Sequence, residues 1–158
     1  MQNAHSKKWI GTEAEEENKI KVRKRIALTQ HSSAINIVKK VASGEINLTS
    51  NKEHFEKHFL GTKQFQAYLE SRQKKGFGKQ SMLTITYEES QKLINNFFGR
   101  GIVASTKSGK PRKQEDINFG KIIGYYVRDN KEYTTTKGRI HYSKKGSHIV
   151  PIEGDYFD

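Results

Sequence analysis

Residues 121–152 decide the fold, and they read KIIGYYVRDNKEYTTTKGRIHYSKKGSHIVPI. Apolar and polar residues alternate through three runs, Lys121–Val127, Tyr133–Tyr142 and Ser147–Ile152, with the period of half-buried strands. Turn-forming Asp-Asn and Lys-Gly pairs separate these runs. The stretch therefore predicts an antiparallel meander.

Helical segments precede the meander. Thr62 is placed to cap a helix that stops at Gly76, and Thr86 with Glu89 forms a capping box for a helix closed by Gly99. Because the helices come first and the strands follow, the sequence predicts an α+β domain with amino-terminal helices packed on one face of an antiparallel sheet.

Two further segments differ from this pattern. Glu13–Val41 suits a helix, so residues 1–44 are interpreted as a helical lead-in or the remnant of a preceding domain, and residues 45–158 as the main domain. Residues 105–116 read STKSGKPRKQED and lack apolar side chains, which predicts a flexible basic loop that projects into solvent.

The composition favours one class of binding partner and excludes several kinds of site. A formal net charge of +12 and a pI near 9.8 favour a polyanionic partner, nucleic acid above all. The absence of cysteine excludes disulfides, thiolate metal sites and a cysteine nucleophile. No apolar run approaches the roughly 20 residues that cross a bilayer, and Met1–Ile10 lacks the apolar core of a signal peptide.

The final hairpin carries the candidate chemistry. With 141 opposite 148, His141 and His148 lie side by side on one face, and Arg139 shares that face. Ile140 and Ile149 then point to the other face, toward the helices. The alternative is that these polar side chains simply face water, as half-exposed hairpins normally allow.

Two histidines and a cation are sufficient to cleave RNA without a metal. One imidazole deprotonates the ribose 2′-OH, another protonates the leaving 5′-oxygen, and a cation stabilises the phosphorane. His54 and His58 have the spacing of a zinc pair, but Glu56 lies two residues after the first histidine rather than immediately after it. We therefore expect neither a metal nor another cofactor.

Four stretches of the chain together resemble a known family. They are Lys57–Thr62, Ser81–Ile85, Gly120–Tyr125 and Ile140–Pro151, the last being the most specific. The resemblance is to the polymorphic toxin type 50 domain, found at the carboxy ends of bacterial toxins and phage head proteins. It covers roughly residues 45–153, and Phe59-Leu60 departs from an Ile-Pro pair common in the family.

The resemblance implies a ribonuclease toxin with a fold similar to that of barnase, EndoU, the transfer-RNA-cleaving colicins and RelE, whose amino-terminal helices pack on a curved antiparallel sheet. The residues that match the family's motifs, together with those suited to phosphate, make up the candidate site. The catalytic candidates are His58, His141, His148, Ser143, Lys144 and Arg139, and the substrate-binding candidates are Thr136, Lys137, Lys107, Lys110, Arg112 and Lys113.

The expected function is metal-independent RNA cleavage that leaves a 2′,3′-cyclic phosphate, in the cytoplasm of a bacterial target cell. The resemblance implies delivery within a larger secreted or phage-borne protein, and an acidic immunity protein as partner. The alternative is a non-catalytic basic nucleic-acid-binding module, with an extension of a phage head protein ranked last. Tyr125, Tyr126 and Tyr142 are interpreted as core residues, which favours the enzyme over the binder.

Overall fold

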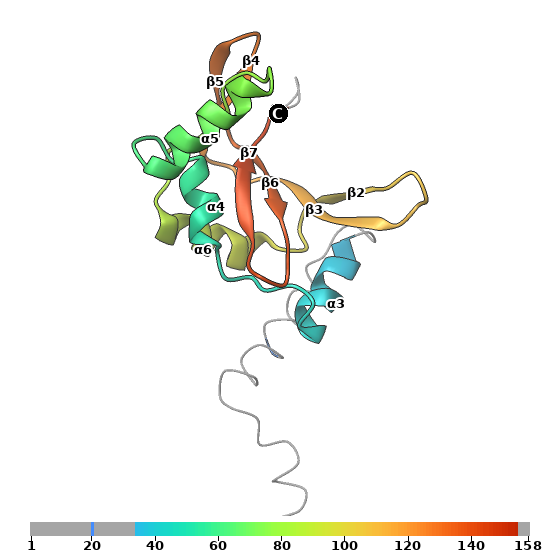
Figure 1. Cartoon of the computed structure of the whole chain (residues 1–158). Helices are drawn as coiled ribbons and strands as arrows, with labels where there is room; N and C mark the ends of the chain where they lie inside the picture. Colours follow the sequence, from blue (N-terminus) through green and yellow to red (C-terminus); the bar gives the residue numbers. More distant parts are fainter. Residues whose placement is uncertain (1–19, 21–33, 155–158) are drawn as a thin grey trace, which may run out of the picture.

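The computed structural model describes residue 20 and residues 34–154, which fold as four helices and seven strands. Helices dominate the first half and strands the second, so the predicted α+β class is confirmed (Figure 1). The elements are α3 (Ile35–Ser43), α4 (Lys52–Lys57), α5 (Lys63–Lys74), β1 (Met82–Leu83), α6 (Tyr87–Phe97), β2 (Ile102–Ser105), β3 (Pro111–Asn118), β4 (Gly124–Arg128), β5 (Lys131–Thr135), β6 (Lys137–His141) and β7 (His148–Pro151).

The helix boundaries follow from local capping. Thr62 accepts a hydrogen bond from the Phe65 amide and starts α5, while Thr86 and Glu89 form the predicted capping box of α6. Gly44, with φ of 84°, ends α3 in the left-handed conformation that glycine adopts without strain. The rest of the helix expected over Glu13–Val41 lies outside the described residues.

The strands form two antiparallel sheets, in the orders β1-β4-β5 and β2-β3-β6-β7, rather than the single curved sheet expected. The expected strand Tyr133–Tyr142 is divided at Thr136 between the two sheets. The hydroxyl of Thr135 accepts a hydrogen bond from the Lys137 amide at 3.0 Å and donates one to the Ile152 carbonyl at 2.8 Å. This local turn bends the chain and transfers it from one sheet to the other.

The expectation of a flexible loop over residues 105–116 is wrong for most of that range. Pro111–Asn118 is strand β3, which pairs with both β2 and β6, and only the tip between β2 and β3 is a turn. The sequence pattern does not reveal this strand because the one buried side chain among residues 112–116 is polar. Glu115 is fully buried, and its carboxylate accepts hydrogen bonds from the Gly99 and Gly101 amides and the Tyr142 hydroxyl. The hairpin does project from the rest of the structure (Figure 1).

A single hydrophobic cluster joins the helices to the sheet β2-β3-β6-β7. Ile140 and Ile149 face each other across β6 and β7 and are almost completely buried. Ile94 of α6 and Phe98, which directly follows α6, are buried in the same cluster. Ile37 of α3 belongs to the same cluster. One face of the β6–β7 hairpin is thereby fixed against the core, and its other face is left to build a surface site.

Candidate functional site

The β6–β7 hairpin places two imidazoles in direct contact. Its register pairs His141 with His148 and Ile140 with Ile149, which is the one that sets the two histidines directly opposite each other. The two imidazole rings stack with their centroids 4.9 Å apart and their planes 8° from parallel. The predicted histidine pair is therefore present on the face that looks away from the core.

A third ring extends this stack from α4. Asn51 caps that helix by accepting a hydrogen bond from the His54 amide, and the His54 ring lies 4.6 Å from the His148 ring at an angle of 20°. His148 is thus enclosed between His54 and His141. Sequence reasoning considered His54 only as half of a zinc pair with His58, and the contact with β7 could not be found from helical spacing.

His58 lies at the carboxyl end of α4 and is only 8% exposed. Its Nδ1 lies 2.9 Å from the Ser81 carbonyl oxygen and 3.2 Å from the Ser81 hydroxyl. Because a carbonyl oxygen only accepts, Nδ1 carries the proton and donates it to Ser81. In the neutral ring, Nε2 is then the nitrogen with the lone pair, as a general base requires.

The environment holds these histidines in their neutral forms. Burial lowers the pKa of His148 to about 3, with further lowering by His141 and His54. Burial also lowers the pKa of His141 to about 4, assisted by the positive charge of Arg139. The pKa of His58 is lowered mainly by burial, against the opposing effect of its hydrogen bond to Ser81. In the free protein near pH 7 each of these rings is therefore neutral and has a lone pair on one nitrogen.

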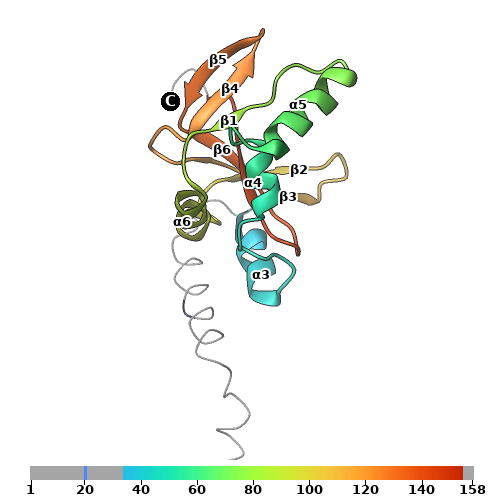
Figure 2. The same ribbon diagram turned by 60° about the vertical axis from the view of Figure 1, so that its left-hand side comes forward.

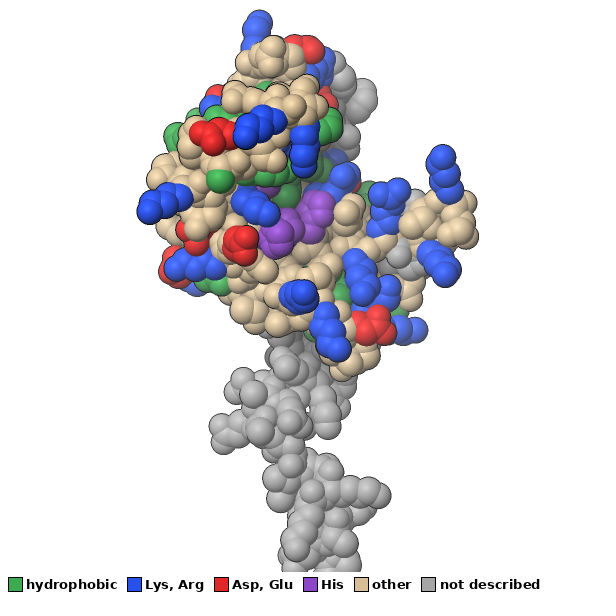
Figure 3. Space-filling view, viewed as in Figure 1, with side chains coloured by type: hydrophobic (Ala, Val, Ile, Leu, Met, Phe, Trp, Pro, Cys, Tyr) green, Lys and Arg blue, Asp and Glu red, His purple; other side chains and the backbone are tan. Residues whose placement is uncertain are grey.

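A cavity of about 490 Å³ opens beside the cluster and is lined by both His58 and His141. Its other walls come from α5, from the segment that leads to β1, from β4 and from the end of β7. Figure 3 shows the histidines in a hollow near the middle of one face, with Lys and Arg side chains around it. The volume falls within the range of roughly 300–1,000 Å³ that is usual for small-ligand sites.

Three cationic side chains line this cavity. Arg72 donates from Nε to the Gly78 carbonyl at 2.7 Å, Lys79 pairs with Glu132 at 2.9 Å, and Arg128 pairs with Glu153. All three ion-pair or hydrogen-bond partners lie at partly exposed positions, where such contacts are weak. A bound phosphate can therefore draw these cations toward itself at little cost.

Arg139 lies two pairs along the hairpin from the histidines, opposite Val150 and therefore on the same face as His141. Its guanidinium makes two hydrogen bonds to Asp116, at 2.7 and 3.1 Å, which raise its pKa. Arg139 is therefore positioned beside His141 and held in place by β3, with its charge partly balanced by the carboxylate.

The remaining terminal candidates lie away from the histidine rings. The Ser143 hydroxyl donates to the Gly146 carbonyl at 2.7 Å and accepts from the Lys145 amide at 3.1 Å, so it holds the turn of the hairpin. Thr136 and Lys137 lie at the opposite end of β6 from His141. Lys107, Lys110, Arg112 and Lys113 are exposed on the β2–β3 hairpin.

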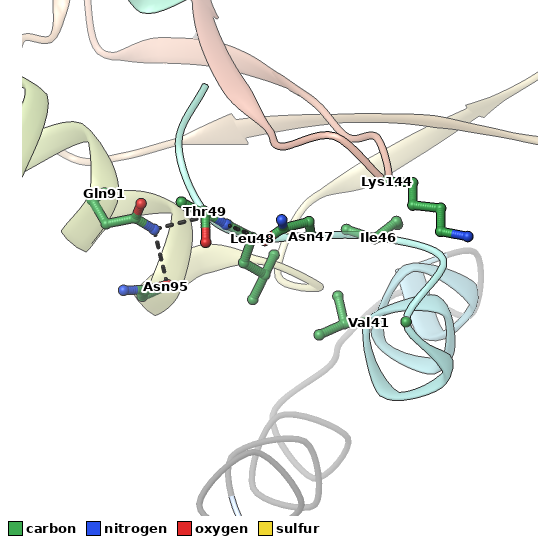
Figure 4. Close-up of a pocket in the computed structure, with 9 residues that line it drawn as sticks. Val41, Ile46, Asn47, Leu48, Thr49, Gln91, Asn95 and Lys144 are labelled. Carbon is green, nitrogen blue, oxygen red and sulfur yellow. Dashed lines mark hydrogen bonds between the residues drawn. The ribbon is translucent and has the colours of Figure 1, made fainter. Parts of the chain in front are cut away.

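Lys144 lines a separate cavity of about 580 Å³ between α3, α6 and the hairpin turn (Figure 4). Its wall is formed by apolar and amide side chains such as Ile46 and Asn95, and Gln91 donates from Nε2 to the Leu48 carbonyl at 2.9 Å. No histidine lines this cavity, whereas His58 and His141 line the other one.

The interpretation of Tyr126 as a core residue is wrong, whereas that of Tyr142 is correct. Tyr142 is 4% exposed, but Tyr126 lines the histidine cavity and stacks on Tyr133, their ring centroids 5.4 Å apart. The signal was present in the alternation of tyrosine with Arg128 on one strand and with Lys131 on the next.

Two negative findings concern the described part of the chain. No group of three or more His, Cys, Asp or Glu side chains within it is arranged to hold a metal ion. None of its helices has the length and apolar character needed to cross a membrane.

Comparison with known proteins identifies one family. The model of the family described as bacterial toxin 50 matches residues 50–151, which is more than half of the chain and includes all four clustered histidines. Neither a curated protein nor a solved structure matches the chain. The protein belongs to the bacterial toxin 50 family.

Proposed function

We propose that this toxin domain is a metal-independent endoribonuclease. The observation that carries the proposal is the convergence of His58 and His141 on one cavity, with His148 stacked behind His141. Two imidazoles on either side of a phosphodiester supply both a base and an acid. The chain's net charge of +12 favours association with RNA, and Arg72, Lys79 and Arg128 line the same cavity.

In this mechanism His58 is the general base. Its Nδ1–H is held by Ser81, so Nε2 accepts the proton of the ribose 2′-OH. The resulting 2′-oxygen attacks the adjacent phosphorus. Since the lowered pKa of His58 keeps this ring neutral near pH 7, the base is ready before the substrate arrives.

The His141–His148 pair supplies the acid. A phosphate in the cavity favours the protonated imidazole, and so raises the pKa of His141 from its low value in the free protein. His141 then protonates the 5′-oxygen as its bond to phosphorus breaks, which leaves a 2′,3′-cyclic phosphate. Arg139 and the cavity cations Arg72 and Arg128 stabilise the charge on the phosphorane.

A second candidate function is a nucleic-acid-binding module without catalysis. The stacked pair Tyr126 and Tyr133, on the same strand face as Arg128, is the kind of surface that such a module uses. A binder, however, has no need of a buried histidine whose tautomer is fixed by Ser81. The two functions are distinguished by one result: a ribonuclease produces RNA fragments, and a binding module leaves the RNA intact.

The proposal extends to partners and place of action. RNA is the substrate, and an acidic immunity protein made by the producing cell covers the cationic cavity. The toxin acts in the cytoplasm of a bacterial target cell, which it reaches as part of a larger secreted or phage-borne protein.

The test is to incubate the purified protein with RNA in excess chelator and to analyse the fragment ends. We expect cleavage to persist and the 3′ ends to carry 2′,3′-cyclic phosphate, because the chemistry uses imidazoles rather than metal-bound water. Activity that is lost with chelator and restored by magnesium would overturn the mechanism. Intact RNA that remains bound would favour the binding module.

A further inference from the structure

Two exposed aromatic side chains flank the histidine cavity. In the described part of the chain, the large hydrophobic side chains left exposed include only two aromatics, Phe77 at 59% and Tyr133 at 42%. Phe77 follows α5 and Tyr133 lies on β5. Figures 1 and 2 show α5 and the β4–β5 ribbon side by side at the same end of the molecule. Aromatic surface that the fold does not bury is therefore concentrated next to the proposed site.

The β4–β5 ribbon combines its aromatics with positive charge. Its register pairs Tyr126 with Tyr133 and Arg128 with Lys131, which places all four side chains on one face of the ribbon. The two tyrosine rings stack at 22° with centroids 5.4 Å apart, and Tyr126 also lines the cavity. The stack therefore runs from the cavity wall to the exposed ring of Tyr133.

The opposite wall has a similar composition. The Arg72 guanidinium carbon lies 5.6 Å from the centroids of both the Tyr68 and Phe77 rings. The Tyr68 ring in turn meets His58 edge to face at 5.6 Å. The guanidinium and the exposed Phe77 ring beside it together form a cationic and aromatic surface of the kind that suits a nucleobase.

We propose that the Tyr126–Tyr133 stack is a subsite for an unpaired nucleobase adjacent to the scissile phosphate, with Phe77 and Arg72 as the facing wall. The proposal rests on the proposed function in taking RNA as the ligand, and it specifies single-stranded RNA. Bases in a duplex are stacked and paired with one another, so their faces cannot lie on Tyr133. The neighbouring Arg128 and Lys131 bind the backbone of the same nucleotides.

The test measures binding of an uncleavable ligand, a short single-stranded 2′-O-methyl RNA, which lacks the attacking hydroxyl. A matched oligonucleotide with abasic sites keeps the phosphates but has no bases to stack. We expect Tyr133→Ala to weaken binding of the base-bearing oligonucleotide about 10-fold, the scale of one lost base–aromatic stack, and to leave binding of the abasic one unchanged. Tyr133→Phe, which keeps the ring, should bind both as the wild type does.

The control is Ile122→Ala, which removes an exposed apolar side chain, 55% exposed, that does not line the cavity. It should bind both oligonucleotides normally.

The proposal is overturned if Tyr133→Ala changes binding of both oligonucleotides equally or of neither, because the ring then contacts something other than a base, such as a partner protein. Equal wild-type affinity for single-stranded and duplex ligands would also overturn it. Since no cleavage is measured, failure of this subsite is distinguishable from failure of the ribonuclease proposal, which the chelator experiment decides.

Discussion

The two faces of the sheet β2-β3-β6-β7 hold polar groups in different ways. On the core face, the buried carboxylate of Glu115 accepts hydrogen bonds from two backbone amides and from the Tyr142 hydroxyl. On the outer face, His141 and His148 contact other rings and line or adjoin an open cavity. A buried polar group held in this way stabilises the fold, whereas clustered titratable rings beside a cavity suit proton transfer. The comparison separates a structural residue, Glu115 on β3, from the histidines on the opposite face of the neighbouring strands β6 and β7.

The largest expected effect is on cleavage by the outer face. His58→Ala and His148→Ala should each reduce the single-turnover rate by roughly 100-fold or more, the usual cost of losing a general acid or base or its immediate support. Affinity for an uncleavable RNA should change much less. Single-turnover assays at saturating protein, together with thermal melting of each variant, check this expectation.

His58→Asn separates chemistry from folding at this position. The asparagine amide can still donate to the Ser81 carbonyl but cannot take a proton, so the variant should melt near the wild-type temperature and still fail to cleave. His54→Ala, which removes a ring that stacks on His148 without lining the cavity, should have a smaller effect. Folded His58 and His148 variants with near-wild-type cleavage would remove both residues from the mechanism.

The core face should show the opposite behaviour. Glu115→Gln places an amide donor where two backbone amides donate, and we expect a loss of about 2–3 kcal/mol in the free energy of unfolding, or about 10 °C in Tm. Glu132→Gln, which breaks only the exposed ion pair with Lys79, should cost less than about 1 kcal/mol. Calorimetry compares the Tm of the two variants. Equal Tm values would show that Glu115 does not stabilise the fold more than the exposed Glu132 does.

The smallest expected effect concerns the projecting β2–β3 hairpin. Replacing its four cations with Gln should weaken RNA binding several-fold and reduce its salt dependence, because fewer counterions are released. The rate at saturating protein should be nearly unchanged. Titrations at several salt concentrations measure the slope, and a fall confined to the saturated rate would contradict a purely binding role. The cations are Lys107, Lys110, Arg112 and Lys113.

Local signals predicted much of this structure. Period-two alternation predicted that His141 and His148 share one face of the hairpin, and capping residues predicted the starts of α5 and α6. These features depend on residues close together in sequence. Strand β3 was missed because a polar strand is recognisable only when Glu115 is seen with its distant partners.

The site was predicted in the same uneven way. The approach of α4 to β7, which stacks His54 on His148, depends on tertiary packing. It cannot be recognised from the periodicity of either element in the sequence. The split of the expected strand at Thr136 arises from the Thr135 turn and its contact with Ile152. It separates Tyr133 from the core sheet, so that its exposed ring stacks on Tyr126, which lines the cavity, instead of lying in the interior.

The most direct measurement is NMR titration of the histidine rings, with and without a short 2′-O-methyl RNA. Burial should hold the pKa values of His141 and His148 at about 4 and about 3 in the free protein. Bound phosphate should raise the pKa of His141 toward neutrality, since the anion favours the protonated ring. Between the pKa of His141 in the free protein and its raised pKa in the complex, the complex binds more protons than the free protein does. RNA binding should therefore strengthen as pH falls through this window. Values near 6.5 in the free protein, unchanged by RNA, would contradict the account, because the histidines would then be ordinary surface residues.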